Sequence, residues 1–529
     1  MISKWLKRII YAIAFIAITV ITILNVVYIN QISNTEVSNI EYYGIIRFLI
    51  SILIALAIIG ISYVLDKIKI SEKLKIVLII ISIILYAGIQ FFWISKSIAI
   101  PYADSEQLLV IAKEFLGQTG LSQYCANYIQ YYPQQLTLSA IIAFLFKVFN
   151  TTSYVFLQNI NVISNVFSVL GLYAICKENS KEQKMNSVLF FIINLTFIPV
   201  IMLSTFVYGD FIGLAFAIWA VYFGIKYSKT NEIKYVVITA ILTSVSCLMR
   251  MNYFIIAIAI AIYWFISTID KEEKSKKDIG IFAISLLIMV TIIALPNTII
   301  KKVYSNKYDL TEEKAFSTIP YLYMGMSEGE YANGWYNNQM GNTVYHLMND
   351  EKEETEEISK QCTQNLKERV SYFIEHPIYT LRFYKEKLIT TWAEPTMEFG
   401  FYNTKCSEDV KIEEHKIANT LLTGRVYEGL KIYQKALIYI ILSGTILAII
   451  QNRKKLNKET MLLCLIFLGG FLFHILWEAK SRYILPYIII LIPVAVQGIQ
   501  HFIKVTCPKS NQKWLIGTRS QSDQTNKKG

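Results

Sequence analysis

Long apolar runs separated by short polar segments dominate the chain. A helix that crosses the hydrocarbon core of a bilayer needs roughly 20 mostly apolar residues. The pattern predicts twelve such helices, at 9–28, 45–65, 76–97, 154–176, 185–203, 211–227, 235–248, 253–269, 279–300, 436–450, 461–476 and 483–503. One further run, 136–149, is short and carries Lys147, so it is either a thirteenth span or a helix along the membrane interface. An all-α polytopic membrane protein with 12–13 spans is therefore predicted.

Charged residues decide between these two topologies. Hydrophobic residues make up 54% of the chain, and the formal net charge is +12. In a soluble protein this charge would suggest nucleic-acid binding, but here Lys and Arg gather in short loops between apolar runs, as in cytoplasmic loops of membrane proteins. We therefore expect no nucleic-acid partner. The basic segments are 66–75, 177–184, 226–234, 271–277, 453–458 and 504–513.

Twelve spans with a cytoplasmic amino terminus place all six basic segments in the cytoplasm. Counting 136–149 as a full crossing would place 177–184 outside, so we assign that run as a juxtamembrane helix. The first apolar run is too long for a signal peptide and lacks a small-residue cleavage site, so we expect it to remain as a span. The predicted units are an N-terminal two-helix extension (1–75), a transmembrane core (76–300) with its first outer loop at 98–153, an extracytoplasmic loop or domain (301–433), C-terminal transmembrane helices (434–503) and a cytoplasmic tail (504–529).

The large outer segment carries helical patterns of its own. An amphipathic helix is predicted over 355–373, ending before Pro377, and a second helix over 378–392, ending before Pro395. The acidic run 350–357 favours a solvated surface over a metal site. None of the seven cysteines forms a CxxC motif, so neither a zinc site nor a redox motif is indicated.

Two aspartates stand at the predicted outer ends of spans. A carboxylate close to the bilayer is costly unless it is paired or has a function, so Asp104 and Asp210 are the first catalytic candidates. Each has a structural alternative, because Asp104 or Ser105 is a possible N-cap for a helix over 107–116, and Asp210 is a possible cap for the helix that begins at 211. Glu106 is the nearest competitor of Asp104 for a catalytic role.

Three cations, Arg250, Lys480 and Arg482, are predicted at the same outer boundary. The planar guanidinium fork of arginine suits phosphate oxygens, whereas the alternative is a side chain that extends to the interface. Positive residues at outer helix ends run against the usual charge distribution, which favours function. His474 and Glu478 are four residues apart, a spacing that suits metal ligands on one helical face, but the sequence offers no third ligand.

The segment 124–135 is dense in aromatic and amide side chains. Such side chains stack on sugar rings and hydrogen-bond to hydroxyl groups. The same composition is also typical of an interfacial aromatic belt.

In order and sidedness these residues resemble the GT-C superfamily of membrane glycosyltransferases, in the branch of the dolichyl-phosphate-mannose protein mannosyltransferases and the lipid A aminoarabinose transferases. The likeness covers most of 75–503. Two departures are that two spans precede the helix equivalent to the family's first, and that Pro133-Gln134 stands where the family has a Pro-Pro pair. The motifs that carry the resemblance are Asp104, Tyr131-Tyr132-Pro133-Gln134-Gln135, Asp210 and Arg482-Tyr483-Ile484-Leu485-Pro486.

The resemblance implies a polyprenyl-phosphate-linked sugar as donor and a cell-envelope polymer, lipid or protein as acceptor, on the outer face of the plasma membrane. Asp104 or Glu106 would take the acceptor proton, and Asp210 would orient the acceptor or that base. The donor phosphate would contact Arg482, Arg250, Lys480 and Tyr483. Sugar or acceptor contacts are expected from Tyr131, Tyr132, Gln134, Tyr208, His474 and Glu478. A resident cofactor is not indicated, and a divalent metal is possible but unsupported.

Two other functions share this membrane architecture. A transporter or flippase for a lipid-linked or anionic substrate would need charged groups near the bilayer midplane and paired broken helices. A ligase or acyltransferase would differ in its donor. The gathering of acidic and basic residues at one face favours the glycosyltransferase.

Overall fold

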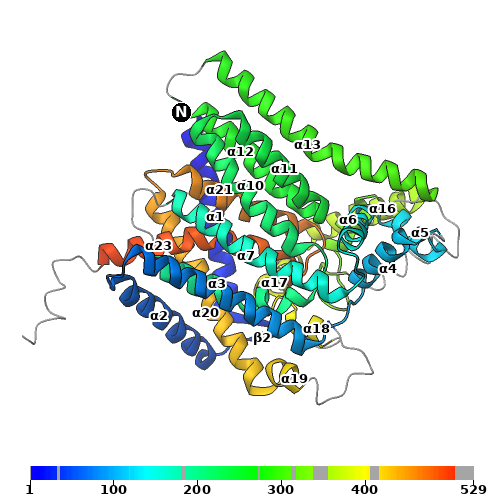
Figure 1. Cartoon of the computed structure of the whole chain (residues 1–529). Helices are drawn as coiled ribbons and strands as arrows, with labels where there is room; N and C mark the ends of the chain where they lie inside the picture. The colour runs from blue at the N-terminus through cyan, green and yellow to red at the C-terminus, as the bar shows by residue number, and fades with distance from the viewer. Residues whose placement is uncertain are drawn as a thin grey trace, which may run out of the picture.

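The computed structural model describes residues 2–32, 36–117, 120–179, 186–271, 275–310, 317–336, 355–404 and 416–506. Helices make up most of this described part (Figure 1). The described residues contain one sheet, an antiparallel pair of strands, β1 (Tyr28–Ile32) and β2 (Ser38–Tyr42). The predicted all-α class is therefore confirmed.

Nine helices within the described ranges are long and apolar enough to cross a membrane. They are α1 (Ile2–Val27), α2 (Ile45–Lys67), α3 (Glu72–Ser97), α7 (Tyr154–Asn179), α10 (Asp210–Thr230), α12 (Phe254–Ile269) with the short helix η2 (Met251–Tyr253) before it, α13 (Lys276–Tyr308), α20 (Gly424–Asn452) and α21 (Lys458–Leu476). The chain is therefore a multi-pass membrane protein.

Three further predicted spans take less regular forms. The run 185–203 becomes α8 (Ser187–Leu195) followed by α9 (Ile198–Met202) and η1 (Leu203–Thr205), bent by 46°. The run 483–503 becomes η4 (Ser481–Ile484) and α22 (Leu485–Ile489) followed by α23 (Ile492–Thr506), bent by 52°. The run 235–248 is the 17-residue α11 (Ile233–Met249). Every predicted apolar run thus lies on a helix or a bent pair of helices.

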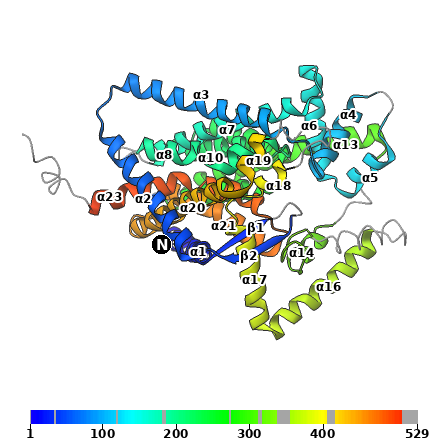
Figure 2. The same ribbon diagram turned by 90° about the horizontal axis from the view of Figure 1, so that it is seen from below.

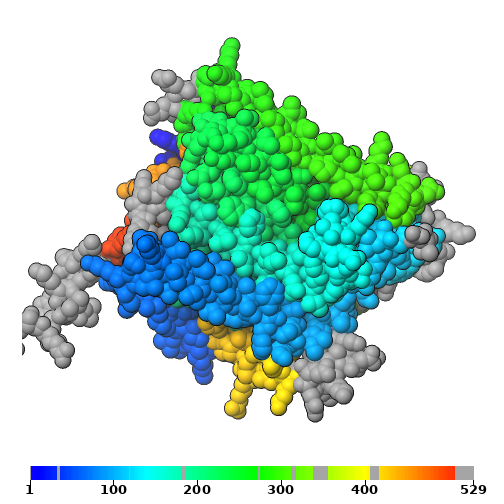
Figure 3. All heavy atoms as spheres, viewed as in Figure 1, coloured from blue at the N-terminus to red at the C-terminus, as the bar shows by residue number. Residues whose placement is uncertain are grey.

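The outer segments are helical as well. The first contains α4 (Asp104–Leu116), α5 (Gln123–Tyr131) and α6 (Gln134–Phe149), and the large one contains α14 (Ile319–Gly325), α16 (Thr355–Glu375), α17 (Pro377–Trp392), α18 (Phe399–Asn403) and α19 (Lys416–Leu422). In Figure 2, α16 and α17 form a V that projects from the bundle, and in Figure 3 the cyan first outer segment lies against the green end of α13. The helices predicted at 107–116, 355–373 and 378–392 are all present.

Two spanning helices extend into the predicted large outer segment. Helix α13 continues to Tyr308, beyond 300, and α20 begins at Gly424, before 434. Both ends of the segment are therefore continuations of these helices. Part of the acidic run 350–357, part of the loop 177–184 and two cysteines, Cys406 and Cys507, lie outside the described residues.

Helix α1 packs inside the bundle against α20 and α21, although the sequence suggested an N-terminal extension. A buried polar contact fixes it there, because the Lys435 Nζ donates to the backbone oxygen of Asn25 at 3.1 Å and to its side-chain Oδ1 at 2.9 Å. The hairpin that follows was not predicted from the sequence. Its strand β1 hydrogen-bonds to the end of α17 through the backbone N–H of Asn30 and the oxygen of Ala393, at 3.2 Å.

A ladder of amides on α7 holds the bent pair α8–α9. Gln158 donates to the Thr205 oxygen at 2.8 Å, and Asn161 donates to the oxygens of Ser204 at 3.1 Å and Phe206 at 3.0 Å. Residues three or four apart share a helix face, so α7 presents these amides together. Unpaired carbonyls cost several kcal/mol in lipid, and these amides satisfy the carbonyls that the end of η1 leaves without a helical partner. The turn that leads into Asp210 is thereby fixed.

The charge pattern predicts that the α10–α11 connection is cytoplasmic and that α5 is extracytoplasmic. Labelling of single cysteines tests this topology. Suitable positions are Lys234, whose side chain is 60% exposed, and Tyr124, which is 64% exposed. We expect a membrane-impermeant maleimide to label Tyr124→Cys in intact cells and Lys234→Cys only after permeabilisation. Cys406 and Cys507 should be changed to serine, since the five cysteines in the described residues are buried. Labelling of Lys234→Cys in intact cells would contradict the topology.

Candidate active site

Asp104 is the first residue of α4, but it does not cap that helix. The cap position is Ala103, which makes no side-chain hydrogen bond to the helix. The Asp104 carboxylate instead accepts hydrogen bonds from the hydroxyls of Tyr128 and Tyr208, each at 2.9 Å. Although it is held from two sides, Asp104 remains exposed. The capping explanation is therefore wrong for Asp104, and its carboxylate is accessible to a substrate.

Asp210 joins two arginines from distant parts of the chain. Its Oδ1 lies 3.2 Å from the Nε of Arg250, which follows α11, and its Oδ2 lies 2.5 Å from a terminal nitrogen of Arg482 in η4. Asp210 does not cap α10 either, because the cap position of that helix is Gly209, which has no side chain to donate or accept a hydrogen bond. Gly209 has a φ of 80°, and a Cβ there would lie 2.5 Å from the Met249 oxygen. Only glycine fits this close approach.

Aromatic rings surround both guanidinium groups. The Arg250 guanidinium lies 4.5 Å from the ring centre of Tyr208 and 5.3 Å from that of Tyr483. The Arg482 guanidinium lies 4.5 Å from the ring of Phe206 and 5.1 Å from that of Tyr402. Such ring faces attract cations and stabilise them where water is scarce. The Nε of Arg482 is buried and has no hydrogen-bond acceptor among the described residues, so one donor remains available.

Tyr208 connects the Asp104 contacts to the arginine cluster. Its hydroxyl donates to Asp104 and accepts a hydrogen bond from the Gln135 amide at 2.6 Å, while its ring faces Arg250. Burial, and then the negative charge of Asp104, raise the pKa of Tyr208 well above its usual value. Tyr208 therefore stays protonated and acts as a donor. Both aspartates belong to one polar network.

The segment after α21 forms the far side of the network. Because α21 ends at Leu476, His474 and Glu478 do not share a helical face, and the metal-type spacing does not apply. The His474 Nδ1 instead lies 3.1 Å from the backbone oxygen of Glu478, whose carboxylate accepts from Tyr483 at 3.3 Å. Lys480 forms an ion pair with Glu36, which follows β1. No group of three or more potential metal ligands occurs in the described part of the chain.

The other predicted residues lie at the edge of this network or apart from it. The amide of Gln134 donates to the Tyr321 hydroxyl at 3.3 Å, which joins α6 to α14. The Tyr132 ring packs on Tyr128, Tyr131 is buried, and Glu106 is exposed.

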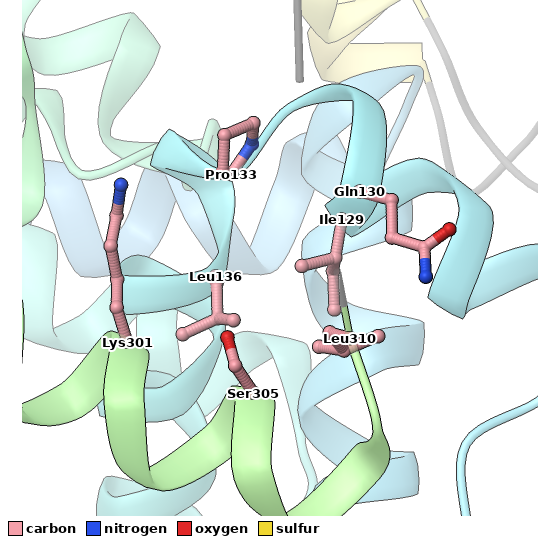
Figure 4. A pocket seen from close by; sticks show the side chains of 7 residues that line it. All are labelled: Ile129, Gln130, Pro133, Leu136, Lys301, Ser305 and Leu310. Carbon is pink, nitrogen blue, oxygen red and sulfur yellow. The ribbon is translucent and has the colours of Figure 1, made fainter. Parts of the chain in front are cut away.

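A small pocket between α5, α6 and α13 is separate from the network. Figure 4 shows the seven side chains around it, none of which is a predicted site residue: Ile129, Gln130, Pro133, Leu136, Lys301, Ser305 and Leu310.

Sequence reasoning missed several members of the network. Tyr128 and Gln135 lie in the aromatic and amide-rich segment, whose composition was the available signal. No comparable signal marked Glu36, Glu394 or Glu398, because only the fold brings these residues close to the network.

Asp210→Asn should destabilise the protein strongly, because it leaves two largely buried guanidiniums without a neutralising charge. The side chains of Arg250 and Arg482 are only 13% and 6% exposed, and breaking a buried ion pair costs about 3–5 kcal/mol. Asp104→Asn should be nearly neutral, since its partners are uncharged hydroxyls. Thermal unfolding of both variants in the same detergent measures this contrast. Equal stability of the two would show that the arginines do not depend on Asp210.

No curated protein matches the chain. A family model described as dolichyl-phosphate-mannose-protein mannosyltransferase matches residues 135–299, which include Tyr208, Asp210 and Arg250.

Two solved structures are similar at low identity. One is the archaeal oligosaccharyltransferase AglB from Archaeoglobus fulgidus in complex with an inhibitory peptide and a dolichol-phosphate, at 12% identity and a TM-score of 0.40, covering 84% of this chain and 52% of that one. The other is the Archaeoglobus fulgidus oligosaccharyltransferase tethered to an acceptor peptide containing the NVT sequon, at 11% identity and a TM-score of 0.39, covering 81% and 50%. The chain spans about half the length of these proteins. The resemblance to the mannosyltransferase branch of the GT-C superfamily, predicted from sequence, is confirmed by the family model over residues 135–299.

Proposed function

We propose that the protein is a glycosyltransferase that moves a sugar from a polyprenyl-phosphate-linked donor to an acceptor hydroxyl on the extracytoplasmic face of the plasma membrane. The observation that carries the proposal is the arrangement around Tyr208. On one side of this residue is an exposed carboxylate, Asp104, and on the other side are two enclosed guanidiniums. A base for the acceptor thus lies next to cations for a phosphate leaving group.

The arginine cluster suits a lipid phosphate. The whole Arg482 residue is 7% exposed, and aromatic rings surround its guanidinium, so little water competes for a bound anion. Its Nε–H has no hydrogen-bond acceptor among the described residues. Low local polarity strengthens charge interactions, and fixed donors aimed at developing charge typically contribute about 3–4 kcal/mol each to catalysis. A phosphate oxygen would take the Nε–H, while Asp210 keeps the rest of the fork aligned. Arg250 would add a second positive charge.

The chemistry follows from this placement. The acceptor hydroxyl oxygen attacks the anomeric carbon and forms the new glycosidic bond, while its proton passes to the Asp104 carboxylate. The bond between the anomeric carbon and the phosphate oxygen breaks, and the polyprenyl phosphate departs with the electron pair. Its developing negative charge is compensated by Arg482 and Arg250. General-base catalysis of this kind contributes about 10²–10⁴-fold.

The substrates meet at the boundary of two environments. The lipid chain of the donor would remain in the bilayer, and the acceptor, a cell-envelope polymer, lipid or protein, would arrive from the aqueous side. Tyr132, Gln134 and Glu478 are proposed to contact the sugars. The description of the matched family names a phosphate-linked sugar, dolichyl-phosphate mannose, which supports a donor of this class, and the match spans Asp210 and Arg250.

The two bent helix pairs are the feature expected of a transporter or flippase. Their breaks lie at Thr196-Phe197 and Ile490-Leu491, none of which is charged. Asp210 and Arg250 instead lie at the ends of α10 and α11, and Arg482 lies at the start of its bent pair. A carrier builds its substrate site at such breaks, near the bilayer midplane, whereas the charged network of this chain lies away from both breaks. This distribution favours the transferase.

Asp104→Asn should lower sugar transfer by about a hundredfold or more, because the amide cannot accept the acceptor proton. Donor binding and melting temperature should stay close to the wild-type values. Glu106→Gln is the matched control, since it removes the same charge two residues further along an exposed helix start and should retain activity. Wild-type transfer by Asp104→Asn would remove it from the mechanism, and loss in Glu106→Gln alone would assign the role to Glu106.

Arg482→Lys should weaken donor use although it keeps the charge. An ammonium group cannot hold Asp210 and a phosphate oxygen at the same time in the geometry of a guanidinium. We expect the KM for a purified undecaprenyl-phosphate sugar to rise about tenfold, the equivalent of roughly 1.4 kcal/mol. Unchanged kinetics in both Arg482→Lys and Arg482→Ala would show that this arginine does not bind the donor.

A further inference from the structure

Two buried glutamates from the large outer segment converge on the turn that carries Arg482. The exposed fractions of Glu394 and Glu398 are 1% and 0%. The Ser481 hydroxyl lies 2.9 Å from Glu394 Oε2 and 3.1 Å from Glu398 Oε1. Glu398 Oε1 also accepts the backbone N–H of Arg482 at 3.1 Å. Two carboxylates thus hold two successive residues of η4.

The segment that supplies these glutamates folds back on itself. Glu394 accepts backbone N–H groups from Thr396 at 2.8 Å and from Glu398 at 2.9 Å, which closes a tight turn. Within it Met397 has a φ of 48° and Glu398 a φ of 66°, a conformation that side-chain-bearing residues adopt only at a cost. Such strain persists where the surroundings fix it, and it concentrates at functional sites. Here it aims Glu398 at η4.

The Arg482 backbone depends on this outside support. Helix η4 has only four residues, and its cap residue, Lys480, makes no side-chain hydrogen bond to it. A short helix of this kind has few internal hydrogen bonds of its own. The Glu398 carboxylate, which accepts the Arg482 N–H, therefore replaces the missing cap, and Glu394 supports the same turn through the Ser481 hydroxyl. Glu398 also interacts electrostatically with the buried guanidinium of Arg482.

We propose that Glu394 and Glu398 are positioning residues that fix the backbone of Ser481 and Arg482, so that the Arg482 guanidinium faces both Asp210 and the donor phosphate. The inference rests on the proposed role of Arg482 in donor binding. The large outer segment then has a defined part in the reaction, because it sets the donor site through the Glu394–Glu398 turn. Neither glutamate contacts the reacting atoms.

Binding of undecaprenyl phosphate to the full chain in nanodiscs tests the proposal without any knowledge of the sugar or the acceptor. Glu398→Leu should weaken binding about tenfold, because it removes the acceptor of the Arg482 N–H. Glu398→Gln keeps a carbonyl oxygen at that position and should stay within about threefold of the wild type. Thr391→Val is the matched control, since it removes a buried hydroxyl of the same segment that has no hydrogen-bond partner among the described residues, and it should bind normally.

Ser481→Ala provides a milder variant should Glu398→Leu fail to fold. It removes only the hydroxyl that both carboxylates share, and we expect binding to weaken about threefold to fivefold in a folded protein whose melting temperature is lowered only modestly. If Arg482→Ala weakens binding while well-folded Glu398→Leu and Ser481→Ala do not, the positioning role is wrong and the donor site stands. If Arg482→Ala leaves binding unchanged, the donor site itself is wrong, and the positioning role fails with it.

Discussion

The structure depends on one carboxylate shared by two enclosed guanidiniums. Burying a charge costs several kcal/mol unless a partner and hydrogen bonds compensate for it, and Asp210 compensates Arg250 and Arg482 together. This pairing requires that three segments lie next to one another: the start of α10, the end of α11 and the turn η4. Gly209 has no side chain because Met249 passes too close. The surrounding aromatic rings complete the enclosure.

Polar side chains from neighbouring helices support this meeting point within an apolar bundle. The α7 amides donate to carbonyls at the end of the bent pair before Asp210, and the Glu398 carboxylate accepts a backbone N–H of η4. Irregular backbone at membrane depth is tolerated only when other protein groups satisfy it. The two irregular segments are therefore the places where the site is built, and the regular helices serve as its frame.

The two halves of the network differ in their contact with water. Asp104 is exposed and held by neutral hydroxyls, whereas Arg482 is enclosed and held by charge and aromatic rings. This division suits a reaction between a water-borne hydroxyl and a lipid-borne phosphate. Tyr208 contacts both halves, through its hydroxyl to Asp104 and through its ring to Arg250. The ion pair between Lys480 and Glu36 adds the β1–β2 connection to the same assembly.

The sequence by itself predicted the apolar helices, because lipid imposes a length and an apolar composition that are visible in any single run. It also singled out Asp104, Asp210 and Arg482 as candidates, since charges at predicted outer helix ends are unusual. It failed where a residue's role depends on contacts between distant segments. Neither the pairing of Asp210 with two arginines nor the reach of Glu398 to η4 has a local signature. Only the tertiary structure decided these contacts, because a buried charge pairs with whichever group the fold places next to it, however distant that group is in the sequence.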